Sequence, residues 1–448
     1  MMSDRPDDGA ATGRSPLTRR DFRLLWAGTT ISQILGMTSP VAFPLIAVDL
    51  LSASIAQVGL ITALGYLPWL VLTLPAGVYV GRLSPRTVLL AADALRAALV
   101  LVVPVLYLLD ALALWHLYAV VTAVGVCSVA YEIAFQTMPT LLLPREALMG
   151  GNARLQAGRA VSFTLGPALG GALVTLLGAP LTPVANAVGF VVSGCCVAAL
   201  RARGRVSDDR PGGGLRRQLG EGLRFVVSQP LLRTSTLASA IGNCCFAGYE
   251  ALVVVFLAKD VGLPAGQLGV LVGTAGLGSL LGAAVASRVA RRLGTARAVW
   301  VPALAVVPFG LMLPATHRGV GVLLFVAGAV VFCAGFGAFT VGQATLVQSA
   351  APPALLSRTI ACTRFVTRSM LFVGGLAGGW LGSVFGPRTA LAIVMGCWAL
   401  APAAMALSSV RRLRDVPVLE AEPGKGERDD AGHDDGTSSQ GSRSRTEP

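Results

Sequence analysis

Charged residues are scarce in this sequence. Asp, Glu, Lys and Arg together make up 13% of its 448 residues, against roughly 25% in soluble domains. Hydrophobic residues make up 54%, and the mean hydropathy is +0.69. So few charges cannot cover a globular surface in water, and the chain is expected to have lipid as its solvent. This excludes soluble enzymes and cytosolic DNA-binding proteins.

Lysine and histidine are nearly absent as well. Lys259 and Lys425 are the only lysines, and the three histidines lie outside the apolar runs or at their edges, which argues against a histidine proton relay within the membrane. The eight cysteines all lie inside apolar runs and have no CxxC spacing. This pattern predicts small core residues rather than a disulfide framework or a metal site. We therefore expect neither a metal nor a cofactor.

Long apolar runs are abundant. A helix needs about 20 mostly apolar residues to cross a membrane, and twelve runs of that kind follow one another in the chain. The expected fold class is therefore an all-α membrane protein with 12 transmembrane helices. The approximate spans are 22–50, 56–80, 87–109, 113–138, 156–178, 181–200, 232–258, 266–287, 296–315, 319–344, 360–384 and 388–409.

The net charge of +13 comes from arginines, which lie in alternate loops between these runs and at the two ends of the chain. The opposite loops hold only Lys259, Arg318 and Arg388. Positive residues stay in the cytoplasm, so both termini should be cytoplasmic, and the expected location is the bacterial inner membrane. Because the bases follow membrane topology, we expect a lipid bilayer around the chain and no nucleic-acid partner.

One long connection, 201–230, divides the runs into six and six. The expected organisation is a cytoplasmic tail (1–20), a six-helix bundle (21–200), a linker (201–230), a second six-helix bundle (231–409) and a disordered tail (410–448). Within the linker, 207–214 should be flexible, and the apolar spacing of 215–227 predicts an amphipathic helix on the membrane surface.

An internal repeat supports two equivalent bundles. A shift of 210 residues aligns 57–84 with 267–294 without a gap and places Gln57 and Gly59 on Gln267 and Gly269. Such a repeat is typical of transporters built from two parallel halves.

Two motifs carry a family resemblance. PAGVYVGRLSPR (75–86) and GPALGG (166–171), together with twelve spans and a long central connection, resemble the major facilitator superfamily over nearly all of 20–410. The segments 136–171 and 221–235 resemble the branch that contains the enterobactin exporter and macrolide-efflux-type proteins. The resemblance implies two six-helix bundles that carry small molecules.

The loop motif departs from the family pattern G-x-x-x-D-R-x-G-R-R. Gly77 and Arg82 match it, but Gly81 stands where the family has an acidic residue that is thought to latch the bundles in the outward-facing state. Asp93 and Arg96, one turn apart, could supply part of this charge network. The branch often carries an acid where this chain has Met37, so no proton site is assumed in the run 22–50.

The GPALGG motif has a physical interpretation of its own. Gly166 and Gly170 are four residues apart and offer a groove for close helix packing, while Pro167 removes a backbone donor and bends the helix. In the family, the pattern formed by Gly166, Pro167, Gly170 and Gly171 marks exporters of the antiporter type, so the resemblance implies export. Ordinary helix packing is the alternative.

Glu132 is the leading site candidate. An ionisable group in hydrocarbon costs roughly 3 kcal/mol, so one that is present usually faces a partner or a cavity. By resemblance the run 113–138 lines the central cavity. Because burial disfavours the charged carboxylate, Glu132 could load and release a proton near neutral pH. The alternative is a fixed ion pair, with Arg159 as the partner.

Other candidates lie in the second half of the chain. Glu250 could bind a cationic substrate or a proton, or be a charge at the cavity mouth without a coupling role. Arg364 and Arg368 are four residues apart and share a helix face. If they line the cavity, they favour an anionic substrate. If their side chains snorkel to lipid headgroups, they carry no information about the substrate. Hydrogen bonds to a substrate could come from Gln33, Asn243, Tyr249 and Gln343.

These features favour a monomeric efflux transporter that exports small amphipathic organic molecules, such as drugs, antibiotics or secondary metabolites, in exchange for protons by alternating access. The sequence contains no Walker A loop, which argues against ATP as the energy source, and no nucleophile–base pair, which argues against an enzyme. The alternatives are a siderophore exporter, a solute importer, and a receptor or assembly partner that kept the fold without transport.

Overall fold

The computed structural model describes residues 20–80, 83–201, 215–350, 353–408 and 411, and in these residues every regular element is a helix. The tails expected at 1–20 and 410–448 lie outside the described residues, apart from Arg20 and Arg411, and so does the segment 207–214.

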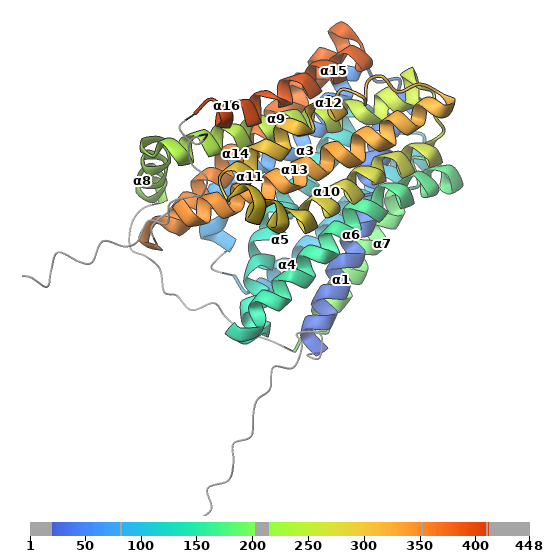
Figure 1. The fold of residues 1–448 in the computed structure, drawn as a ribbon. Helices are drawn as coiled ribbons and strands as arrows, with labels where there is room; N and C mark the ends of the chain where they lie inside the picture. The colour runs from blue at the N-terminus through green and yellow to red at the C-terminus, as the bar shows by residue number, and fades with distance from the viewer. Residues whose placement is uncertain (1–19, 81–82, 202–214, 351–352, 409–410, 412–448) are drawn as a thin grey trace, which may run out of the picture.

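The helices before residue 200 form the N-terminal bundle (Figure 1). Within it α1 packs against α6 and α7, α4 packs against α5 and α7, and α3 packs against α5. The elements are α1 (Arg20–Gly36), α2 (Ser39–Leu45), η2 (Ile46–Leu50), α3 (Ile55–Val80), α4 (Pro85–Leu108), α5 (Leu114–Leu142), α6 (Arg145–Leu177) and α7 (Pro183–Ala198).

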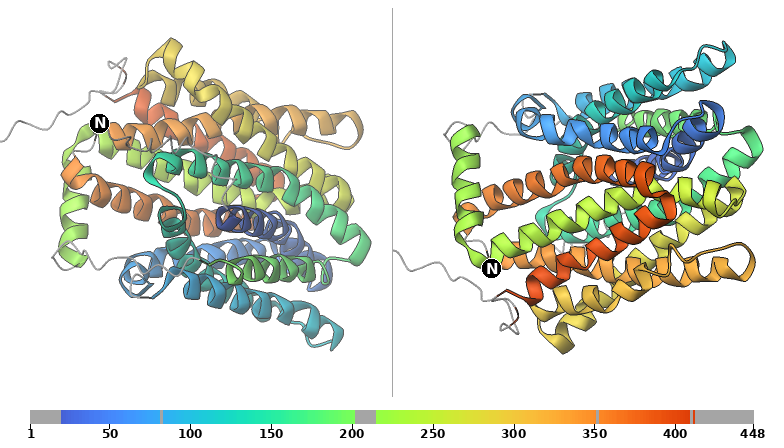
Figure 2. Two further views of the ribbon diagram at one scale, coloured as in Figure 1. Left: turned by 90° about the horizontal axis from the view of Figure 1, so that it is seen from below. Right: turned by 90° about the horizontal axis from the view of Figure 1, so that it is seen from above.

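The helices after residue 229 form the C-terminal bundle, in which α9 packs against α14, α15 and α16, and α10 packs against α13. Helix α8 (Leu215–Ser228) covers the range 215–227 of the predicted linker helix and runs across the ends of the long helices (Figures 1 and 2). The bundle consists of α9 (Pro230–Val255), η3 (Phe256–Asp260), α10 (Ala265–Leu293), α11 (Arg297–Ala305), α12 (Val307–Gly310), η4 (Gly319–Gly321), α13 (Val322–Ala350), α14 (Pro353–Phe385), α15 (Pro387–Trp398) and α16 (Leu400–Ala406).

Local signals explain where these helices begin and end. Helix α4 begins after Ser84, whose hydroxyl accepts a hydrogen bond from the amide of Thr87 (3.2 Å), and Pro85 occupies its first turn. Helix α6 ends before Gly178, which has a φ of +81°, a conformation that favours glycine. Capping and proline placement were therefore readable from the sequence.

Among the described residues, ten stretches of helix are long and apolar enough to cross a membrane, and each falls on one of the predicted spans. The other two predicted spans are 181–200, which corresponds to the shorter α7, and 296–315, which corresponds to α11 and α12. The helix of this second span is interrupted at Val306, between Pro302 and Pro308. Twelve spans and cytoplasmic termini remain predictions.

The two bundles share an unusual backbone feature. Helix α2 continues into a π-helical turn at Ile46–Leu50, and α9 continues into one at Phe256–Asp260. These turns are related by the same shift of 210 residues as the sequence repeat. The repeat therefore extends to the backbone conformation of the two halves.

The bundles meet mainly through two pairs of helices, α3 with α14 and α6 with α10, and to a smaller extent where α2 and α3 contact α9. Glycines lie at both crossings. A Cβ atom added to Gly379 would lie 2.7 Å from the Cα of Gly59, and one added to Gly269 would lie 2.6 Å from the Cα of Gly171. Because no side chain fits at these four positions, the backbones approach closely. All four glycines lie near the helix ends opposite the arginine-rich loops.

We predict that alanine at these contacts destabilises the protein. Gly269→Ala and Gly59→Ala should each lower the free energy of unfolding by about 1–3 kcal/mol, because the added methyl group overpacks a backbone contact. The measurement is the thermal unfolding temperature of the purified protein in detergent. Gly396→Ala in α15 is the matched control, since its Cβ would meet nothing within 4 Å. Equal unfolding temperatures for all three variants would contradict the helix contacts described.

Candidate functional site

Two cavities lie between the bundles. The larger one, about 500 Å³, is lined mainly by α9, α10 and α13, with α14, α15 and parts of α2, α3 and α6. The smaller one, about 420 Å³, is lined by α1 to α5 and α7 of the N-terminal bundle and by Glu250 of α9. Four residues line both cavities: Met37, Pro40, Tyr66 and Glu250. These residues therefore mark the boundary where the N-terminal and C-terminal halves of the site meet.

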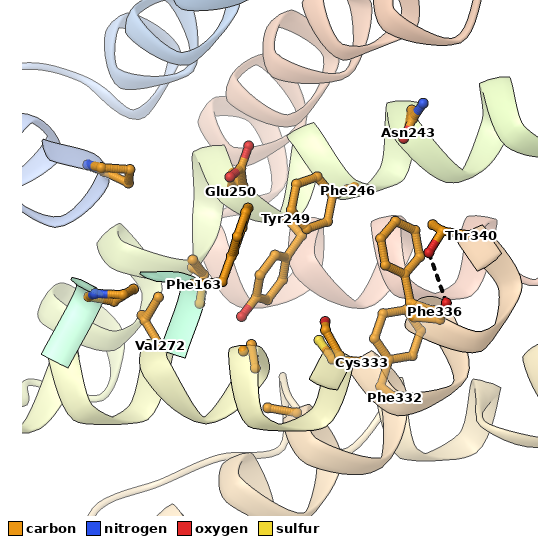
Figure 3. A pocket seen from close by; sticks show the side chains of 18 of the residues that line it. Phe163, Asn243, Phe246, Tyr249, Glu250, Val272, Phe332, Cys333, Phe336 and Thr340 are labelled. Carbon is orange, nitrogen blue, oxygen red and sulfur yellow. Dashed lines mark hydrogen bonds between the residues drawn. The ribbon is translucent and has the colours of Figure 1, made fainter. Parts of the chain in front are cut away.

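The larger cavity is predominantly apolar, and part of its wall is a group of aromatic side chains. Phe246 of α9 stacks on Phe336 of α13 with ring centroids 5.3 Å apart, and Phe332 contacts Trp398 edge-on at 4.9 Å. Figure 3 shows Phe246 and Tyr249 facing Cys333, Phe332 and Phe336 across the space. An apolar cavity of this size with few polar groups is typical of sites for drug-sized molecules.

Glu250 is held by a residue of the opposite bundle. The hydroxyl of Tyr66 in α3 donates a hydrogen bond of 2.6 Å to Oε2 of Glu250 in α9. Within the described residues, no arginine or lysine nitrogen lies within 4.0 Å of this carboxyl group. In Figure 3 the Glu250 side chain points away from Cys333, whereas the neighbouring Tyr249 points towards it. Glu250 thus lies at the junction of the cavities without a bonded cation.

Glu132 has the arginine partner that was considered for it. Nη2 of Arg159 in α6 donates to both carboxylate oxygens of Glu132 in α5, at 2.8 and 2.9 Å, and Gln136 donates at 3.3 Å. The side chains are 20% and 35% exposed for Glu132 and Arg159. Neither residue is among those that line the two cavities. The geometry is that of an ion pair that joins α5 to α6.

Asp93 and Arg96 form a second ion pair, buried within α4. The guanidinium of Arg96 also lies 4.1 Å from the ring centroid of Tyr131 and 4.4 Å from that of Phe190, and it lines the smaller cavity. Because aromatic faces attract a cation, the Arg96 guanidinium is stabilised by the Asp93 carboxylate and by the rings of Tyr131 and Phe190.

The two arginines of α14 have different surroundings. Arg368 lines the larger cavity, and its guanidinium lies 4.5 Å from the ring centroid of Trp69 in α3. Arg364, one turn earlier, is exposed. Within this pair, Arg368 alone therefore adds positive charge to the cavity.

The other candidates fall in three places. Gln33 lines the smaller cavity, while Tyr249 and Asn243 line the larger one, where Asn243 also donates to the carbonyl of Thr367 at 3.0 Å. Gln343 is buried away from both cavities and bonds twice to Ser235.

The loop motif is described only in part. Gly77 lies in the last turns of α3, and Arg82 lies outside the described residues.

The GPALGG motif lies at a junction of three segments. Gly166 faces Met37 and the carbonyl of Ile34, and Gly170 faces Thr38. Gly171 faces Gly269 of the other bundle, and Pro167 lines the larger cavity. The motif therefore serves close packing, on both its own bundle and the opposite one, and it forms part of the cavity wall.

Tyr66 and Trp69 were not predicted as site residues. Both lie in the apolar run 56–80, where an aromatic side chain carries no sequence signal for a site. Their role depends on α3 crossing the boundary between the bundles, where Tyr66 meets Glu250 and Trp69 meets Arg368. The single sequence feature that could have linked Tyr66 and Trp69 is their spacing of about one helical turn, which places them on one face of the helix.

Two helical bundles of apolar helices around a cavity define a multi-pass membrane transporter for small molecules. The chain belongs to the Major Facilitator Superfamily, which matches residues 25–375. Members of this family are transporters and not enzymes. This confirms the family resemblance, while the narrower branch suggested by 136–171 and 221–235 stays a prediction.

Curated relatives include multidrug efflux pumps. The chain is 30% identical to "Multidrug efflux pump Tap" of Mycolicibacterium fortuitum over 295 residues, which are 63% of this chain and 70% of that protein. It is 31% identical to the protein of the same name from Mycobacterium tuberculosis (strain ATCC 25618 / H37Rv) over 283 residues, which are 60% of this chain and 66% of the relative.

Solved structures share the fold at low sequence identity. A mutant of the nucleoside transporter NupG superposes with a TM-score of 0.75 at 12% identity, covering 86% of this chain and 99% of that one. A bacterial homolog of the human lysosomal transporter Spinster, in an inward-facing and unoccupied conformation, has a TM-score of 0.67 at 15% identity, covering 90% and 98%. These likenesses support the architecture alone.

We predict that Glu132 and Arg159 stabilise the protein as a pair. In a double-mutant cycle with Glu132→Ala, Arg159→Ala and the double variant, unfolding should show a coupling energy of about 0.5–3 kcal/mol, because each single change leaves the other charge unpaired. The measurement is thermal unfolding in detergent, with Gln136→Ala as the control for the weaker 3.3 Å contact. Strictly additive effects would show that the pair contributes no stability.

Proposed function

We propose that this transporter exports small amphipathic organic molecules, including drugs, antibiotics or secondary metabolites, across the bacterial inner membrane. The observation that carries this proposal is the apolar cavity of about 500 Å³ at the bundle boundary, with its group of aromatic side chains. Its apolar walls suit the apolar part of such a molecule. A small number of polar groups, among them Asn243, Glu250 and Arg368, suit the polar part.

The direction of transport rests on two supports. The GPALGG motif at 166–171 resembles the pattern of antiporter-type exporters, and the curated relatives include multidrug efflux pumps. Within the family, the resemblance of 136–171 and 221–235 to the enterobactin-exporter and macrolide-efflux-type branch keeps a siderophore exporter as the second candidate.

Alternating access gives the two helix crossings a role. In the present structure the bundles touch through α3 with α14 and α6 with α10 at the end opposite the arginine-rich loops. Rocking of one bundle against the other would separate these glycine contacts and expose the cavities to that side. The N-terminal bundle is expected to move as a body, because the pair Glu132–Arg159 joins α5 to α6 within it.

The energy source that we propose is proton antiport. The protein is expected to work as a monomer, with lipid around it, and without a metal or other cofactor. Cargo entering from the cytoplasm would meet the cavities, and proton uptake from the opposite side would reset the transporter.

Export can be tested with a cavity-filling variant and its matched control. In an efflux-deficient bacterial host, wild type should lower the accumulation of members of a panel of fluorescent compounds and antibiotics, and a protonophore should abolish the difference. Cells that express Ala275→Trp should accumulate these compounds to the same level as cells with the empty vector, because Ala275 lines the larger cavity. Leu277→Trp, on the same helix but exposed and outside the cavity lining, should behave like wild type.

Two outcomes would contradict the proposal. Equal accumulation with wild type and empty vector across the panel, with expression confirmed, would direct the search to siderophores and then to a receptor without transport. Export that Ala275→Trp leaves intact would place the cargo path outside the larger cavity.

A further inference from the structure

The smaller cavity has no occupant in the proposed export function, and its wall differs from that of the larger cavity. The larger cavity has a group of aromatic side chains, whereas the smaller one is lined in part by polar side chains without charge. These include the hydroxyls of Ser32 and Thr62 and the amides of Gln33 and Asn186. A cavity of about 420 Å³ falls within the size range of small-molecule sites, in which a few placed polar groups set specificity.

Asn186 of α7 has an unmet hydrogen bond in this cavity. The residue is 4% exposed, and its Nδ2 donates to the Ser39 hydroxyl at 2.7 Å, but its Oδ1 has no partner among the described residues. Gly36 leaves space beside this oxygen, since a Cβ atom added to Gly36 would lie 3.7 Å from Oδ1. Because a buried polar atom without a partner is costly, Oδ1 is suited to a hydrogen bond from a molecule in the cavity.

Gln33 of α1 supplies a second amide to the same cavity. Within the described residues its side chain has no hydrogen-bond partner. The shift of 210 residues places Gln33 on Asn243 of α9, which lines the larger cavity. There the Asn243 amide already donates to the carbonyl of Thr367 at 3.0 Å. Of these two equivalent amides, Gln33 is therefore the one that remains free for a bound molecule.

The charged groups on the wall of the smaller cavity already have partners. Arg96 is paired with Asp93, and Glu250, at the cavity boundary, accepts a hydrogen bond from the Tyr66 hydroxyl. The groups left over are amides and hydroxyls, which carry no charge. An amide side chain both donates and accepts hydrogen bonds, and so does a hydroxyl group. The complement of this wall is therefore a neutral group that bears hydroxyls, such as a sugar or a polyol.

We propose that the smaller cavity is a separate subsite that binds a neutral hydroxylated group of the cargo, with Gln33 and Asn186 as specificity-determining residues. This inference rests on the proposed export function and names the class of molecule that is exported. The apolar body of the cargo occupies the larger cavity, and a sugar or polyol group attached to it occupies the smaller one. Four residues line both cavities, so one molecule can extend from one into the other.

Such a subsite selects strongly against molecules that lack the hydroxyl groups. A site built to hydrogen-bond a hydroxyl rejects the analogue without it, because the polar groups of the site are then left unpaired. Asn186 would suffer this loss most, since its oxygen is shielded from bulk water. The apolar body alone would still bind in the larger cavity, but more weakly.

The test compares two neutral probes that share a coumarin ring: methylumbelliferyl glucoside, which carries a sugar, and the methyl ether of methylumbelliferone, which carries a methyl group in its place. Binding to the purified full chain in lipid nanodiscs is measured by equilibrium dialysis, with empty nanodiscs as the blank. Wild type should bind the glucoside at least about tenfold more tightly than the ether.

The variants assign this preference to the smaller cavity. In Gln33→Met, which removes the amide and keeps a side chain of similar length, glucoside affinity should fall about tenfold while ether affinity stays within about twofold. Asn186→Leu should act in the same direction. Gln156→Met is the matched control, because Gln156 of α6 is exposed and lies outside both cavity linings. It should keep the wild-type preference.

Three results would overturn the subsite: no binding of the glucoside by wild type, equal binding of the two probes, or a preference that Gln33→Met leaves unchanged. Gln33→Met decides even if Asn186→Leu fails to fold. Ala275→Trp separates this inference from the export function, because it should weaken both probes. If it does so while Gln33→Met has no effect, the smaller subsite alone is refuted. Absence of export of every compound in the panel refutes the transport function instead.

Discussion

Charge inside lipid must be neutralised or shared, and this constraint organises the interior of the protein. Arg96 is held by Asp93 and by the rings of Tyr131 and Phe190, and Arg368 is held by the ring of Trp69. Arginine keeps its charge in nearly every environment, so a guanidinium within these helices requires fixed partners. A carboxyl group has a second option, since it can take up a proton. Glu250 is half-buried, accepts a hydrogen bond from Tyr66, and has no arginine or lysine nitrogen within 4.0 Å among the described residues.

Close backbone approach determines where the cavities can lie. The glycine contacts Gly59–Gly379 and Gly171–Gly269 bring the two bundles together at one end of the helices. Side chains of ordinary size separate the helices further along, where α9, α10 and α13 surround the larger cavity. The same kind of glycine contact occurs twice because the chain is built from two related halves, as the matched π-helical turns after α2 and α9 also show.

Much of the architecture could be predicted from the residues. Apolar runs of about 20 residues indicated the long helices, and the pattern of leucine and valine over 215–227 indicated α8. The candidate acids and arginines were also predictable, because an ionisable group stands out in an apolar run. The same reasoning offered Glu132 two roles and could not choose between them. Which side chain lies against Glu132 depends on how α5 packs against α6, and the structure places Nη2 of Arg159 2.8 and 2.9 Å from the carboxylate oxygens. The role of Glu132 in transport stays a prediction.

The sequence by itself determined that this chain is a membrane protein with two related halves. It also determined that few ionisable groups lie within the helices, because composition and periodicity are local properties of the chain. Only the tertiary structure decided which of those groups share a site. Tyr66 and Glu250 are far apart in the sequence and belong to different bundles, yet one hydrogen bond of 2.6 Å joins them. Such a pairing depends on how α3 crosses α9, and helix crossings are set by packing over the whole molecule and not by the spacing within either helix.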